Sequence, residues 1–273
     1  DTLDPEVLFV EAAAEFDAGH HPDAARKFGL ILEHFPDSRY ARPARFNRGL
    51  TLLATQRPAA AAADFRTFIA ERPNDPDNAE ARLRLGEALV EAGEWADARE
   101  TLLNRLAADP VTRADEIEAR ARLARACRML GLYREARVHV ERTMTLHGRN
   151  VTSPEMADNP FVAMAAFEGA ATWHDLFAQI RFVLPTDRME KDLTDKATLF
   201  LKAQAEYLMT MRLGNVFWAV QAGTRVGRMY EEFYDAIMSA QTPPEFSPQE
   251  LRAYLDELRA QARPLVAKAV AAY

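Results

Sequence analysis

The chain has 273 residues, of which 48% are hydrophobic and 27% charged, with 11 glycines, a single cysteine and a net charge of −7. This composition predicts a folded, helix-rich protein and excludes a collagen-like or intrinsically disordered chain. Cys127 closes no disulfide within the chain and no Cys/His cluster is present, so neither a disulfide framework nor a metal site is expected. Neither half is basic, which argues against nucleic acid as a partner, and no apolar run approaches the roughly 20 residues of a transmembrane segment.

The N-terminal half repeats one pattern four times. Each copy has a small residue, a large apolar residue, a turn, an alanine and an apolar residue four positions after that alanine. Three copies close with Pro36, Pro73 and Pro110, spaced by 37 residues, and the fourth has Gly148 in place of proline. The units span about residues 4–37, 41–78, 79–114 and 116–149, which places the repeat region at 1–149.

Each unit is predicted to be a pair of antiparallel helices. The turn residues break the backbone, and the alanine lets the second helix approach the first closely. A single pair cannot bury both of its faces, so the four pairs are expected to stack into one continuous core. The fold class predicted from this pattern is therefore all-α, with an α-solenoid of about four helix-turn-helix repeats.

These residues resemble the tetratricopeptide repeat family. The third copy matches the family pattern best, through Leu85-Gly86, Gly93-Glu94-Trp95, Ala98 and Pro110. The resemblance implies a right-handed superhelix whose first helices line a concave groove for protein partners. The turn from Phe35 to Ala41 resembles bacterial cell-envelope members of the family, which implies a periplasmic or envelope location, with the cytoplasm as the alternative.

Residues 150–273 follow a different plan and are expected to form an atypical C-terminal helical bundle that caps or extends the repeats. Apolar residues recur at helical spacing over about 161–182, 186–211 and 214–240. A further helix is predicted from Ser247, where Glu250 completes a capping box.

This half resembles the C-terminal extension of tetratricopeptide proteins from myxobacteria and related bacteria. The residues that carry the resemblance are Lys196-Ala197, Trp218-Ala219, Arg225-Val226-Gly227 and Tyr230-Glu231. It implies a part in an envelope assembly such as a gliding-motility or outer-membrane complex.

No catalytic or cofactor motif is present: GxGxxG, the P-loop, GxSxG and HExxH are all missing from the sequence. We therefore expect a non-enzymatic interaction scaffold without a cofactor. The alternative is a small-molecule-binding or enzymatic role for the C-terminal region, because its aromatic and methionine residues are numerous enough to line a cavity.

The concave groove is the predicted partner site. Its predicted residues are Phe9, Phe16, Phe46, Asn47, Leu50, Leu53, Arg84, Glu87, Arg122, Arg125 and Arg128. The first half of this set is apolar and the second half positive, which suits a peptide or helix with apolar anchors and an acidic or C-terminal carboxylate group. The alternative interpretation is that the phenylalanines pack against neighbouring repeats and the arginines pair with local acids such as Glu118.

Overall fold

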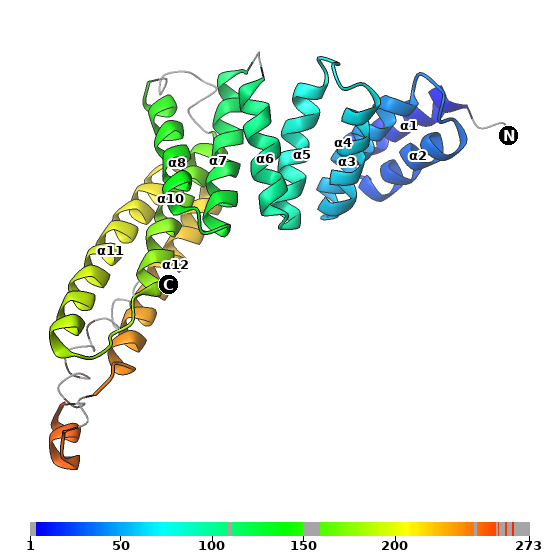
Figure 1. Cartoon of the computed structure of the whole chain (residues 1–273). Coiled ribbons are helices and arrows are strands. Elements are labelled where there is room, and N and C mark those ends of the chain that lie inside the picture. The colour runs from blue at the N-terminus through cyan, green and yellow to red at the C-terminus, as the bar shows by residue number, and fades with distance from the viewer. Residues whose placement is uncertain are drawn as a thin grey trace. The chain divides into compact units, whose positions relative to one another are not determined.

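The chain is helical in nearly all of the part that the structure describes (Figure 1). The computed structural model describes residues 4–108, 111–149, 159–242 and 245–254, together with residues 256, 260 and 264. No strand occurs among these residues. The all-α fold class predicted from the sequence is confirmed. Pro110 and residues 150–158, which the sequence analysis used as boundaries, lie outside the described residues.

The repeat region contains eight helices within its described residues, two for each sequence unit. They are α1 (Pro5–Asp17), α2 (His21–His34), α3 (Ala41–Ala54), α4 (Pro58–Glu71), α5 (Asn78–Ala92), α6 (Trp95–Ala107), α7 (Arg113–Met129) and α8 (Tyr133–Gly148). The C-terminal region adds α10 (Pro160–Gln179), α11 (Thr186–Arg212) and α12 (Val216–Met238). None of the helices in the described ranges is both long enough and apolar enough to cross a membrane.

Each first helix of a unit is followed by a residue with a left-handed backbone. These residues are Gly19 (φ 78°), Gln56 (φ 59°), Gly93 (φ 77°) and Gly131 (φ 73°). Glycine adopts this conformation without the Cβ clash that other residues meet. Three of the four turns therefore use the residue type that the geometry favours, and the second repeat places a glutamine there.

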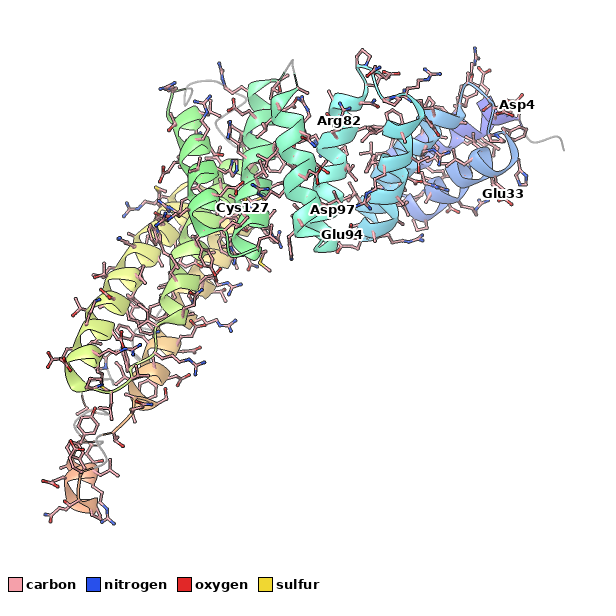
Figure 2. All side chains as sticks on the ribbon, viewed as in Figure 1. Asp4, Glu33, Arg82, Glu94, Asp97 and Cys127 are labelled. Carbon is pink, nitrogen blue, oxygen red and sulfur yellow. The ribbon has the colours of Figure 1, made fainter. Side chains whose placement is uncertain are left out.

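Several helices begin at a polar side chain that accepts hydrogen bonds from the first turn. Asp4, labelled in Figure 2, accepts from the backbone N–H of Glu6 at 2.7 Å, and Thr112 accepts from that of Asp115 at 3.1 Å. The capping box is confirmed, because Glu250 accepts from Ser247 N at 2.8 Å. Such caps satisfy donors that have no partner within the helix.

The helices of the repeats pack closely because small residues stand where they meet. A Cβ added at Gly49 would lie 2.7 Å from Cζ of Phe65, and one added at Gly86 would lie 2.6 Å from Cγ of Leu102. Both Phe65 and Leu102 are fully buried. On the surface, Arg66 of α4 joins the next repeat by donating to Glu94 at 3.0 Å and Asp97 at 2.6 Å; both acids are labelled in Figure 2.

The chain divides into two compact units, residues 1–131 and 132–273. The sequence pattern instead places the end of the repeats at residue 149, so the two divisions differ by α8. The physical reason is that α8 packs on α10 within the second unit, where Arg137 donates to both carboxylate oxygens of Glu206 of α11 at 2.7 Å.

The second unit is organised around α10. Residues 162–172 of this helix are buried without interruption. An aromatic cluster joins it to α11 and α12, with Phe177 and Phe200 at 5.8 Å and Phe200 and Phe233 at 5.6 Å between ring centroids. A helix that is apolar on all sides belongs at the centre of its bundle.

Candidate functional site

All of the predicted groove residues lie on first helices of the repeats, within the first unit. Phe9 and Phe16 lie on α1, and Phe46, Asn47, Leu50 and Leu53 lie on α3; Arg84 and Glu87 lie on α5, and Arg122, Arg125 and Arg128 lie on α7. All of them except Arg122, which is buried, are half-buried. Side chains that are partly covered and partly accessible can both pack within a repeat and contact a partner.

The predicted aromatic residues contribute to packing within and between repeats. Phe9 contacts Phe28 of α2 and Tyr40, with ring centroids 5.7 and 5.5 Å apart. Phe46 contacts Phe65 and Phe68 of α4 at 5.6 and 5.3 Å. Leu50 and Leu53 also pack against the core of repeats 2 and 3. These side chains therefore have a structural role in addition to any role in binding.

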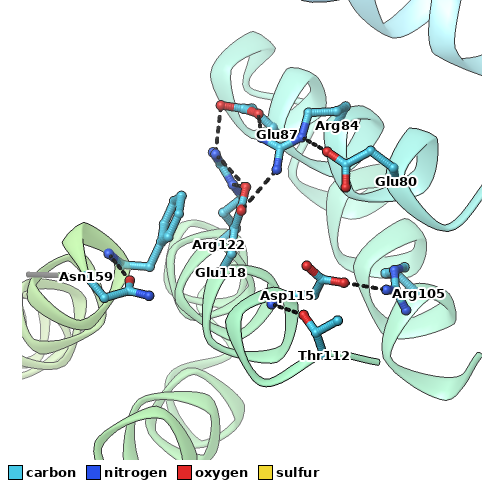
Figure 3. A network of polar contacts seen from close by, with 10 residues as sticks. Glu80, Arg84, Glu87, Arg105, Thr112, Asp115, Glu118, Arg122 and Asn159 are labelled. Carbon is cyan, nitrogen blue, oxygen red and sulfur yellow. Dashed lines mark hydrogen bonds and ion pairs between the residues drawn. The ribbon is translucent and has the colours of Figure 1, made fainter. Parts of the chain in front are cut away.

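Arg84 lies at the centre of an ionic network that joins α5 and α7 (Figure 3). It donates to Glu80 at 2.8 Å, to Glu118 at 3.0 Å and to Glu87. Burial disfavours the charge on Arg84, but the carboxylates of Glu118, Glu87 and Glu80 outweigh this effect and hold its pKa above the usual value. Arg84 is thus a charge that the protein itself already neutralises.

Arg122 belongs to the same network and is only 5% exposed. It lies 2.7 Å from Glu87 and 3.1 Å from Glu118. Arg125 lies 3.8 Å from Glu91. Arg84, Arg122 and Arg125, which were predicted to make this half of the groove positive, are therefore matched by glutamates of α5 and α7, as the alternative interpretation of the sequence proposed for Glu118.

Two hollows adjoin at Asn47 of α3. The first hollow, of about 220 Å³, is lined by Ala13, Phe16, Asp17, Phe28, Asn47 and Leu50. The second hollow, of about 290 Å³, is lined by Arg42, Pro43, Phe46, Asn47, Phe68, Asp77 and Glu80. Of these lining residues, Phe16, Phe46, Asn47 and Leu50 were predicted from the sequence. Arg42, Phe68 and Asp77 were not predicted, because the repeat pattern points to the middle of each first helix and not to the helix ends and second helices that complete the walls.

Asn47 has an amide that is available to a ligand. Among the described residues, its side chain makes no hydrogen bond, while its backbone carbonyl accepts from Thr51 Oγ1 at 2.7 Å. A primary amide offers both donors and an acceptor, which is the pattern that a peptide main chain also presents. The arrangement can hold an extended chain with side chains in the hollows on either side.

A third hollow of about 520 Å³ lies in the second unit, between the end of α10 and helices α11 and α12. Its lining includes Lys196, Glu232, Asp235 and Ser239. Lys196 is 2% exposed and donates to the carbonyls of Phe177 and Ile180 at 2.8 and 3.0 Å. Burial lowers the pKa of Lys196 to about 8 although the charge of Glu232 opposes this shift.

A chain of polar side chains connects α10, α11 and α12 at the third hollow. His174 of α10 contacts the hydroxyl of Tyr207 at 3.2 Å and a carboxylate oxygen of Glu232 at 2.8 Å. Burial raises the pKa of Glu232, but the hydrogen bonds and charges of His174 and Arg228 outweigh it, so the pKa lies below its ordinary value. His174 is thus a core histidine with satisfied nitrogens.

Comparison with known proteins identifies the N-terminal helices. A family model described as tetratricopeptide repeat matches residues 9–76 and, overlapping with them, residues 46–116. Residues 9–116 are thus similar to tetratricopeptide repeats. The matched repeats contain both hollows at Asn47, while Arg122, Arg125 and Arg128 lie beyond the matched residues.

Among solved structures, the chain is similar to the tetratricopeptide repeat domain of P58(IPK). The sequences are 14% identical, and the match covers 97% of this chain and 99% of that domain with a TM-score of 0.38. No relative was found among the curated proteins. The resemblance of the C-terminal half to myxobacterial motility proteins stays a prediction.

Proposed function

We propose that the protein is a non-enzymatic scaffold that binds a peptide or helix of a partner protein along the first helices of its tetratricopeptide repeats. Repeats of this kind bind protein partners. The observation that carries the proposal is the pair of hollows that meet at Asn47, whose amide has no hydrogen bond within the described protein. Side chains of the partner fill the hollows, with an apolar residue in the first, and Asn47 binds the main chain between them.

The test compares Asn47→Ala with Asn104→Ala, because Asn104 is an exposed asparagine on α6 that lines neither hollow. Partners are captured from envelope and cytosolic fractions of the native organism, and the affinity of each purified partner is then measured. We expect Asn47→Ala to weaken binding about tenfold, as loss of one or two hydrogen bonds predicts, and Asn104→Ala to leave it unchanged. Equal affinity for both variants would contradict the proposal that the partner binds at Asn47.

The proposal includes an acidic or C-terminal carboxylate group of the partner at Arg125 and Arg128. Arg84 and Arg122 are poor probes of this feature, because both are already paired with Glu87 and Glu118. Reversing the charge of either arginine would place like charges together and disrupt the fold. The informative variant is Arg125→Glu with Arg128→Glu, measured on the same purified partner. Unchanged affinity and salt dependence would exclude a carboxylate contact there.

We also propose that the protein works in the bacterial cell envelope, as part of a motility or outer-membrane assembly, because its inter-repeat turn resembles that of envelope members of the family. Fractionation of native cells tests this location. Recovery in the cytosolic fraction alone would contradict it.

A second candidate function is small-molecule binding or catalysis in the C-terminal unit. It is favoured by the third hollow, where the buried amine of Lys196 and the carboxylate of Glu232 line one cavity. A thermal-shift screen of metabolites on the wild type and on Lys196→Met tests this role. A ligand that stabilises only the wild type would support it, and the lack of any stabilising ligand would count against it.

A further inference from the structure

The charges that reach solvent at the second hollow are carboxylates. The side chain of Asp77 is 75% exposed and that of Glu80 is 53% exposed. Asp77 makes one distant contact, 3.7 Å from Arg42, and Glu80 uses one oxygen to accept from Arg84. Each acid therefore keeps acceptor positions for a further donor.

The one cation in the lining, Arg42, is held within the wall. Its side chain is 13% exposed and its guanidinium lies 3.8 Å from the centre of the Phe68 ring. One terminal nitrogen lies 3.2 Å from Asp75 and the other donates to Asn78 at 3.3 Å. Since Asp75 balances the charge of Arg42, the carboxylates of Asp77 and Glu80 give the mouth of the hollow a net negative charge.

The walls of the hollow are apolar and aromatic. Phe46 and Phe68 contact each other with centroids 5.3 Å apart and ring planes tilted by 51°, and Pro43 completes this side. Lysine and arginine side chains combine an apolar stem with a charged tip, and they bury the stem while the tip reaches polar surroundings. Aromatic faces also attract the cationic tip.

We propose that the second hollow binds a lysine or arginine side chain of the partner peptide, with its stem against Phe46 and Phe68 and its charge at Asp77 and Glu80. This inference rests on the proposed function, because it assigns a residue type to one part of the same groove. An acidic side chain is disfavoured there by repulsion from Asp77 and Glu80. The basic residue lies next to an apolar residue that fills the first hollow across Asn47.

The experiment selects a random-peptide phage library in parallel on the intact wild-type chain and on three variants. Asp77→Asn with Glu80→Gln removes the two charges and keeps the shapes of the side chains. Glu100→Gln is the control, because Glu100 is an exposed glutamate of α6 that lines neither hollow. Asn47→Ala tests whether the selected peptides bind at Asn47.

We expect the wild type and Glu100→Gln to select peptides with lysine or arginine beside an apolar residue. The double variant should lose this preference and bind the selected peptides about tenfold more weakly, as two partly exposed ion pairs predict. Replacing the basic residue of a selected peptide with glutamine should reproduce the loss on the wild type. If the double variant is less stable by circular dichroism, Asp77→Asn alone is compared.

Two other outcomes overturn the inference in distinguishable ways. Peptides that require Asn47 but show no preference for basic residues, or the same preference on the double variant, would refute the basic subsite and leave the proposed function standing. Failure of the wild type to select any peptide would refute the proposed function and the subsite together.

Discussion

Gly86 of α5 shows why the repeat requires a small residue on its first helix. A Cβ at this position would lie 2.6 Å from Cγ of Leu102, a side chain with no exposed surface. The contact involves the branch point of a buried side chain, so α5 and α6 must separate to relieve it. Overpacking of this kind costs about 1–3 kcal/mol.

Gly86→Ala is therefore expected to destabilise the first unit by up to about 2 kcal/mol, because the overpacking outweighs the gain of about 1 kcal/mol from the helix propensity of alanine. Gly29→Ala, in the middle of α2, is the control, because the added Cβ would meet only Nη1 of Arg48 at 3.8 Å. That change should stabilise the protein. Urea unfolding monitored by circular dichroism distinguishes the two, and stabilisation by both substitutions would contradict the packing argument.

At the scale of single residues, the sequence predicted the helices on which the groove side chains lie but left open whether the arginines are paired with local acids. Asn47 and Phe46 follow from repeat spacing, which fixes the face of a helix on which a residue lies. Neutralisation of Arg84 and Arg122 depends on Glu87 and Glu118 lying between α5 and α7. The spacing of residues along one helix does not determine which side chains of a neighbouring helix lie close enough to form ion pairs with it.

At the scale of helices, one carboxylate links α8, α10 and α11. Glu206 accepts from Arg137 and from Nε1 of Trp173, the latter at 2.9 Å, and Arg137 lies over the Trp173 ring at 4.7 Å. A Cβ at Gly169 would lie 2.8 Å from this carboxylate, so the glycine makes room for it. A bidentate ion pair with a third donor fixes the geometry of three helices.

Glu206→Gln is expected to destabilise the second unit by about 1–3 kcal/mol, because it weakens charged hydrogen bonds that are largely shielded from water. Glu141→Gln removes a 67% exposed carboxylate that lies 3.7 Å from the same arginine, and should change stability by less than about 0.5 kcal/mol. A double-mutant cycle with Arg137→Met measures the coupling. A coupling energy near zero would show that α8 is held by apolar packing alone.

The bounds of the helices and their pairing within the first three repeats were largely predictable, whereas the packing of the C-terminal helices was not. The expected helix at 161–182 is α10, which ends at Gln179, and the expected helix at 186–211 matches α11 within one residue. Helix ends depend on local signals such as Pro160 and Asn159. The packing of α8 on α10 depends on residues far apart in the sequence, and the end of the repeats at residue 149 stays a prediction.

At the scale of the whole molecule, the two compact units predict where the chain can be cut. A fragment of residues 132–273 keeps α8 and its ion pair with α11, whereas a fragment of residues 150–273 exposes the side of α10 that α8 covers. We expect the longer fragment to unfold cooperatively and the shorter one to be less helical or to aggregate. Circular dichroism and analytical gel filtration check this, and equal behaviour would favour the boundary at residue 149.

The left-handed backbone of Gln56 offers a way to separate folding from recognition. Gln56→Gly should relieve a conformation that non-glycine residues adopt at a cost, and so stabilise the first unit by about 0.5–1 kcal/mol. Gln56 lines neither hollow at Asn47. Differential scanning calorimetry measures the gain, and a lower melting temperature would contradict it. In this more stable background, a groove variant that no longer binds its partner has lost complementarity and not structure, so affinity becomes a direct report on the binding surface.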